Sequence, residues 1–90
     1  MFYVYILQSE KDQRTYVGYT NNLKQRLREH NKGSVRTTRN RRPLRLIFSE
    51  NYNSKEQAEK REVYWKSGAG RRKLKKFWDG GFPPIQISFE

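Results

Sequence analysis

The stretch from residue 15 to 31, TYVGYTNNLKQRLREHN, constrains the fold of this chain more than any other part of the sequence. Residues 15–20 are rich in β-branched and aromatic side chains, which is typical of a strand, and Asn21 or Asn22 can cap a helix directly after it. That helix is expected to end near Lys32 and Gly33. The stretch therefore predicts a strand that turns directly into a basic amphipathic helix carrying the chain's only histidine.

An earlier strand is predicted at residues 2–8, where the side chains alternate between two faces in the period-2 pattern of a strand. A polar loop then reverses the chain. If residues 15–20 pair back as a hairpin, Tyr16 and Gly18 share one face, so that each strand can contribute a tyrosine hydroxyl, from Tyr5 and Tyr16, to one side of the sheet.

In the first predicted helix, Leu23 and Leu27 form the apolar stripe. At about 100° per residue, Arg26 and His30 fall beside this stripe, whereas Arg28 points to solvent. Two polar side chains four residues apart are therefore expected to border the core.

The rest of the chain predicts a third strand and two further helices. A basic loop at 33–43 is expected to lead into a strand at 44–52. A capping box at Ser54 then begins a helix that runs to about Lys66, and a break at 67–70 separates it from a short helix at 71–78. The expected fold is α+β, a small three-stranded antiparallel sheet flanked by helices in the order β-β-α-β-α-α. One domain is expected over residues 1–79, followed by an extended C-terminal tail at 80–90.

Glu62 stands out on the second predicted helix because it shares a face with Ala58 and Trp65. A carboxylate on an inward, apolar face is costly without a partner. A structural ion pair with Arg26 or with Arg61 would be one explanation.

The charge balance points to a polyanionic partner. Twenty Lys and Arg against nine Asp and Glu give a formal net charge of +11, which favours salt-sensitive association with nucleic acid, or less strongly with an anionic membrane. The loop at 33–43 looks too polar to bury. Nucleic-acid phosphates are predicted to contact residues of this loop and of the third helix, namely Arg36, Arg39, Arg41, Arg42, Arg71, Arg72, Lys73, Lys75 and Lys76.

Several classes of protein are disfavoured. No apolar run approaches the ~20 residues of a membrane-spanning helix, and no signal-peptide pattern follows Met1. The chain has no cysteine, which excludes disulfides and thiolate metal sites. A cytoplasmic protein without membrane contact is expected.

Over residues 2 to 78 the chain resembles the GIY-YIG nuclease superfamily, in particular its small single-domain bacterial proteins. Tyr3-Val4-Tyr5 and Tyr16-Val17-Gly18 are similar to the two tripeptide motifs of the family, with Tyr3 in place of a glycine. Arg26 and His30 match the family's helix residues, and Glu62 matches its acidic metal ligand. The stretch HNKGSVRTT, followed by Arg42-Pro43, resembles the small-protein subgroup, but no match to the late asparagine of the repair-nuclease branch is evident.

The resemblance implies a metal-dependent endonuclease that hydrolyses phosphodiester bonds in DNA, in repair or recombination, on branched or single-stranded substrates. It makes Tyr5, Tyr16, Arg26, His30 and Glu62 the catalytic residues, with Mg²⁺ or Mn²⁺ held by Glu62. Arg26 would hold the phosphate, and one tyrosine, with Tyr5 preferred, would act as the general base or relay to it. His30 would order a tyrosine or shuttle a proton.

Two other interpretations stay open at this stage. One is a basic nucleic-acid-binding module whose hydrolytic site is idle or needs a partner. The other is an RNA-associated protein of ribosomal type, which would prefer RNA to DNA.

Overall fold

A central strand with a partner on each side forms the core of the molecule. The computed structural model describes the backbone of residues 1–80 and the side chains of residues 1–76. Strands β1 (Phe2–Ser9), β2 (Thr15–Thr20) and β3 (Leu44–Tyr52) form an antiparallel sheet in the order β2-β1-β3. Helix α1 (Leu23–Lys32) follows β2, a short 3₁₀ turn η1 (Arg39–Arg41) precedes β3, and helices α2 (Lys55–Lys66) and α3 (Gly68–Gly80) follow β3. The predicted α+β fold and element order are confirmed.

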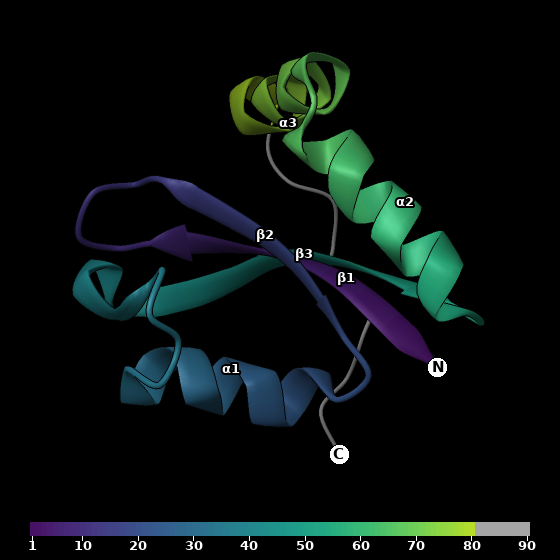
Figure 1. The fold of residues 1–90 in the computed structure, drawn as a ribbon. Helices are drawn as coiled ribbons and strands as arrows, with labels where there is room; N and C mark the ends of the chain where they lie inside the picture. Colours follow the sequence, from purple (N-terminus) through teal and green to yellow (C-terminus); the bar gives the residue numbers. More distant parts are fainter. Residues whose placement is uncertain (81–90) are drawn as a thin grey trace.

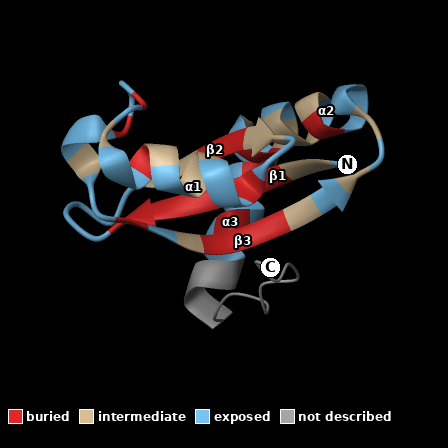
Figure 2. Cartoon of the chain, turned by 90° about the horizontal axis from the view of Figure 1, so that it is seen from below, coloured by how far each residue is buried: buried red, intermediate tan, exposed pale blue. Residues whose placement is uncertain are grey.

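The helices lie in two layers, one on each face of the sheet. Helix α1 covers one face, whereas α2 and α3 cover the other (Figure 1). Strand β1 is buried from Val4 to Ser9 because it lies between the other two strands and between both helical layers (Figure 2). Within residues 1–80, no helix is both long enough and apolar enough to cross a membrane.

The hairpin register places the two predicted tyrosines on one face. Tyr5 lies opposite Gly18, and Leu7 lies opposite Tyr16. Since residues two apart on a strand share a face, Tyr5 and Tyr16 both point toward α1. The predicted hairpin is therefore confirmed in pairing and in facing.

Side-chain caps begin the first two helices where the sequence predicts them. The Asn22 side chain accepts a hydrogen bond from the backbone N–H of Gln25 at 3.1 Å, so Asn22 rather than Asn21 is the cap. Ser54 accepts from the N–H of Gln57 at 3.2 Å and begins α2. Helix α1 ends at Lys32 and is capped by Gly33 in the left-handed conformation, as expected.

The predicted break at residues 67–70 is wrong, because α3 already begins at Gly68. The interruption is confined to Ser67, whose hydroxyl accepts a hydrogen bond from the backbone N–H of Gly70 at 3.2 Å and so caps the new helix. Gly70 is buried against α2, where a Cβ atom would overlap the backbone of Tyr64 and Trp65. The glycine that suggested a break instead permits a close helix–helix contact. The predicted tail at 80–90 lies outside the described residues from position 81 onward.

The prediction that the loop at 33–43 is too polar to bury is wrong for two of its side chains. Val35 is only 9% exposed, and Thr38 is fully buried. The Ser9 hydroxyl donates a hydrogen bond of 2.6 Å to the backbone carbonyl of Arg41, which ties the end of the loop to β1. Charge count alone does not predict this, because the loop buries its few small and apolar side chains while Arg36, Arg39 and Arg42 stay exposed.

We expect Gly70→Ala to destabilise the fold much more than Gly68→Ala. The new methyl group at position 70 must push α3 away from α2, with a loss of about 2 kcal/mol or more in the free energy of unfolding. At position 68 the nearest heavy atom would be an Arg72 side-chain nitrogen at 3.5 Å, and alanine favours helix over glycine by up to about 1 kcal/mol. Urea unfolding followed by tryptophan fluorescence measures both, and equal effects would contradict the close contact.

Candidate active site

A buried chain of hydrogen bonds joins three elements next to the sheet. The Tyr5 hydroxyl lies 2.9 Å from Nε2 of His30, and Nδ1 of His30 lies 2.8 Å from the Thr38 hydroxyl. Tyr5 is 1% exposed, and the other two residues are fully buried. Strand β1, helix α1 and the loop before η1 each supply one member, so the chain fixes these elements relative to one another.

Gly18 makes room for this arrangement. A Cβ atom at position 18 would lie 2.6 Å from the Tyr5 hydroxyl oxygen and 3.0 Å from a ring carbon of Tyr16. Because Gly18 is paired directly opposite Tyr5, any side chain there would displace the tyrosine from His30. The glycine of the second tripeptide motif is therefore explained by space for two aromatic rings.

Tyr16 connects the buried chain to the surface. Its ring centroid lies 5.0 Å from that of His30 and 6.3 Å from that of Tyr5. Tyr16 is half-buried, unlike Tyr5. Of the two tyrosines, Tyr16 is thus the one that a bound molecule can reach without a rearrangement of the core.

Arg26 acts on the buried tyrosine from the surface side. Burial raises the pKa of Tyr5 to about 12, and a hydrogen bond from Arg26 opposes this rise. The same hydrogen bond raises the pKa of Arg26, whose guanidinium also forms an ion pair of 3.1 Å with Glu29. The prediction that Arg26 borders the core is confirmed, and its guanidinium reaches the Tyr5 hydroxyl.

His30 is neutral at physiological pH. Burial, together with the positive charge of Arg26, lowers the pKa of His30 to about 4, and the negative charge of Glu29 opposes this change. Because Arg26 donates to the Tyr5 oxygen, the hydroxyl proton of Tyr5 can point at Nε2 of His30. The histidine proton then lies on Nδ1 and is donated to the Thr38 hydroxyl.

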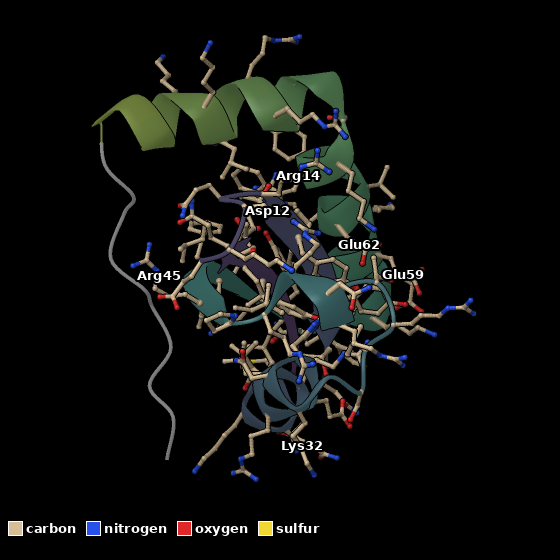
Figure 3. The ribbon with its side chains drawn as sticks, turned by 90° about the vertical axis from the view of Figure 1, so that its left-hand side faces the viewer. Asp12, Arg14, Lys32, Arg45, Glu59 and Glu62 are labelled. Carbon is tan, nitrogen blue, oxygen red and sulfur yellow. The ribbon has the colours of Figure 1, made fainter. Side chains whose placement is uncertain are left out.

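Glu62 approaches from the other helical layer. Its side chain is 21% exposed and forms an ion pair of 3.4 Å with Lys66, one turn later on α2. Its negative charge contributes to raising the pKa of both Tyr5 and Tyr19, which places the carboxylate electrostatically near β2. In Figure 3, Glu62 extends from α2 beside the sheet.

The two ion-pair partners suggested for Glu62 are both occupied elsewhere. Arg61 donates two hydrogen bonds to the Glu50 carboxylate, at 3.3 and 3.0 Å, and Arg26 pairs with Glu29. The prediction of an ion pair between Glu62 and Arg26 or Arg61 is therefore wrong. Sequence spacing does not show that Arg61 faces Glu50 on β3.

The donor set at Glu62 fits a hard divalent cation. In the part of the chain that the structure describes, no three His, Cys, Asp or Glu side chains gather closely enough to hold a metal ion on their own. A single carboxylate suits Mg²⁺ or Mn²⁺, which retain water ligands and take phosphate oxygens as further ligands. Binding of Mg²⁺ or Mn²⁺ by Glu62 stays a prediction.

The basic residues predicted to contact phosphate fall into two groups. In the loop, Arg36 is exposed, Arg39 and Arg42 donate to backbone carbonyls of the loop, and the half-buried Arg41 donates to the Thr15 carbonyl at 3.2 Å. On α3 the predicted residues Arg71, Arg72, Lys73, Lys75 and Lys76 are all exposed. Phosphate contact by either group stays a prediction, and Arg41 is engaged within the protein.

Thr38 is the site residue that sequence reasoning missed. It lies in a loop read as solvated, eight residues after His30, and no periodicity links the two. The only available signal was its place among small residues in HNKGSVRTT, within the stretch that resembles the small-protein subgroup.

Comparison with known proteins identifies the family of this chain. A family model described as the GIY-YIG catalytic domain matches residues 1–75. The matched domain and the observed fold are those of a small nuclease-type catalytic domain. The chain belongs to the GIY-YIG family.

Similar proteins come from several bacteria. UPF0213 protein CPE1444 of Clostridium perfringens is 43% identical over 75 residues, covering 82% of this chain and 80% of that protein. A UPF0213 protein of Limosilactobacillus reuteri is 39% identical over 89 residues, covering 96% of this chain and 92% of its own. The solution NMR structure of the UPF0213 protein BH0048 from Bacillus halodurans superposes with a TM-score of 0.54 at 35% identity, covering 93% of this chain and 89% of that one.

We expect His30 to make the fold sensitive to acid. The unfolded chain binds a proton at His30 below a pH of about 6.5, whereas the folded chain stays neutral there down to about pH 4, so stability falls as the pH drops through this window. At about 1.4 kcal/mol per pKa unit, the loss approaches about 3 kcal/mol. Urea unfolding of the wild type and of His30→Gln at pH 7, 5 and 4 measures the difference, and parallel pH profiles would disprove the neutral, buried histidine.

Proposed function

We propose that this protein is a DNA endonuclease that hydrolyses phosphodiester bonds with one divalent cation, Mg²⁺ or Mn²⁺, bound to Glu62. The observation that carries the proposal is the contact between the buried Tyr5 hydroxyl and His30, beside Arg26 and the partly exposed Tyr16. A purely structural tyrosine needs one hydrogen-bond partner for its buried hydroxyl, whereas Tyr5 has two, the Arg26 guanidinium and the neutral His30 imidazole. A tyrosine that must exchange a proton benefits from both.

The hydrogen bonds suggest how a water molecule would be activated. As the water attacks phosphorus, its proton passes to the Tyr5 oxygen, which substrate binding has to uncover because Tyr5 is 1% exposed. The Tyr5 hydroxyl proton passes at the same time to Nε2 of His30. Arg26 stabilises negative charge on the Tyr5 oxygen during this exchange, and Thr38 keeps the receiving nitrogen free of a proton. Neutral His30 is available as the acceptor above about pH 4.

The phosphate itself would meet the exposed side of the site. Arg26 is more than a third exposed along its side chain, and its planar guanidinium can hold two phosphate oxygens. Tyr16 can donate its hydroxyl to the same group. A cation on Glu62 would supply Lewis-acid stabilisation of the charge that develops on the phosphate and the leaving oxygen.

The rival proposal is a nucleic-acid-binding module with an idle or partner-dependent site. Two observations favour it: Tyr5 is almost fully buried with a pKa of about 12, and Lys66 neutralises the proposed metal ligand. Salt-dependent DNA binding without cleavage or a metal-dependent thermal shift would support this alternative. A role in repair or recombination, branched or single-stranded substrates and a cytoplasmic location stay predictions.

Cleavage of DNA by the purified protein in Mg²⁺ or Mn²⁺ tests the proposal directly. Plasmid, single-stranded, branched and flap DNA should be compared. Glu62→Gln and Tyr5→Phe should each lower the cleavage rate by about 100-fold or more, since they remove the metal ligand and the proton acceptor. Glu56→Gln, an exposed change on the same helix, should keep the rate within about twofold of the wild type.

A contaminating nuclease would give the same cleavage in all of these variants. That result would overturn the site assignment even if DNA is cut. Circular dichroism of each variant separates loss of chemistry from loss of fold.

Thr38 should act as a positioning residue for His30. Thr38→Val removes the hydroxyl that fixes the imidazole tautomer at nearly constant volume, and we expect roughly a tenfold or greater loss of kcat with little change in KM. Thr38→Ser keeps the hydroxyl and should restore most of the rate. The pH profile of kcat should change in Thr38→Val and not in Thr38→Ser. Equal losses in both variants would show that Thr38 matters for packing alone.

A further inference from the structure

A groove lies between the β1–β2 hairpin and α3, away from the hydrogen-bonded site. Its volume is about 640 Å³, and its lining residues are Gln13, Arg14, Thr15, Arg71, Leu74 and Lys75. Arg14 lies at the end of the hairpin turn. Thr15 begins β2, and the other three residues, Arg71, Leu74 and Lys75, lie in the first turns of α3. Arg14 was not among the residues that the sequence predicts to meet phosphate.

The groove continues to the site. A second cavity, of about 340 Å³, shares Thr15, Arg71 and Leu74 with the groove and extends along β2 to Tyr16 and Lys66. The Tyr16 ring also packs edge-on against the His30 ring, and Lys66 forms an ion pair with Glu62. An extended molecule in the groove would therefore reach Tyr16 and Lys66, which lie next to the proposed catalytic residues.

The lining carries positive charge only. Arg14, Arg71, Lys75 and Lys66 supply cations, and neither cavity is lined by an aspartate or a glutamate. Other hollows of the described surface are mixed in charge: one is lined by Glu56, Glu59 and Lys60 on α2, and another contains both Arg26 and Glu29. The charge around the site is thus one-sided.

The walls are arranged to hold successive phosphates. Arg71 and Lys75 are four residues apart on α3, and neighbours at this spacing project from the same helix face. Arg14 faces them across the groove, and Figure 3 shows it beside α3. All three residues are exposed, and none forms an ion pair within the part of the chain that the structure describes.

We infer that this groove, defined by Arg14, Arg71 and Lys75, binds the sugar–phosphate backbone of the DNA on one side of the scissile phosphate. The inference rests on the proposed function and adds a direction to it. The substrate leaves the site toward α3, past Tyr16 and Lys66, and not toward the hollow of mixed charge at Glu56, Glu59 and Lys60 on α2. The groove contributes affinity and orientation but does not read the base sequence, because its charged side chains contact phosphates.

Two matched double variants test the groove. Arg71→Gln with Lys75→Gln removes its cations from α3, and Arg28→Gln with Lys32→Gln removes the same residue types at the same spacing from the exposed face of α1. Figure 3 shows Lys32 at the far end of the molecule from α3. Each pair lowers the net charge equally, so a general charge effect is the same in both.

Binding is measured without cleavage, by fluorescence anisotropy of labelled single-stranded and duplex DNA in EDTA over a range of salt concentrations. The α3 double variant should weaken binding about tenfold near 0.1 M salt and lower the slope of log Kd against log salt by about 1.4–1.8, from about 0.7–0.9 per phosphate contact. The α1 double variant should stay within about twofold of the wild type. Arg14→Gln should weaken binding, and Arg45→Gln, on β3, should not.

Equal weakening by the two double variants, or wild-type affinity in the α3 variant, would overturn the groove. Tighter binding to anionic vesicles than to DNA, lost in the α3 variant, would overturn DNA as its occupant. If no substrate is ever cut while the α3 variant alone loses DNA binding, the proposed nuclease function fails and the groove stands. If cleavage is seen but both double variants behave alike, the function stands and the groove fails.

The direction has a separate test where cleavage is observed. Uncharged methylphosphonate linkages are placed on one side of the mapped cut and then on the other. Binding should weaken more for one side than for the other, and the α3 double variant should abolish this difference. Equal effects of the two sides in the wild-type protein would contradict a one-sided track.

Discussion

The hydrogen bond between the Tyr5 hydroxyl and Nε2 of His30 is the contact on which the site depends. It lies in the most buried part of the molecule, between the central strand and the helix that covers it. A polar group there must have a partner, since an unsatisfied buried hydroxyl or imidazole costs about 1–3 kcal/mol. Gly18 leaves the space for this contact, and Thr38 satisfies the remaining nitrogen of the imidazole.

The electrostatics of the site follow from that burial. Burial keeps His30 neutral and Tyr5 protonated, and Arg26 brings one positive charge to the boundary of this otherwise neutral region. The Glu62 carboxylate comes from α2, on the opposite face of the sheet. The two layers can contribute to one site because β2 is the outer strand, so the partly exposed Tyr16 and the α2 side chains border the same edge.

Much of the fold was predictable because short-range patterns specify it. The structure confirms the strand at 2–8, the asparagine and serine caps, and the position of Tyr5 and Tyr16 on one face of the hairpin. Each of these features depends on residues near one another in the chain. The errors arose where long-range packing decides the outcome. Gly70 looked like a helix breaker and is a close-contact residue, and the arginine-rich loop buries Thr38 beneath its charged surface.

The sequence by itself determined the elements, the family resemblance and the presence of two tyrosines on one face, because strand and helix periods follow from local backbone geometry. Only the tertiary structure decided that Tyr5 is buried while Tyr16 is accessible, and that Glu62 pairs with Lys66 instead of an arginine. Only the structure set Arg14 across a groove from α3. Burial, ion pairing and grooves depend on which distant segments meet, and no local period encodes that.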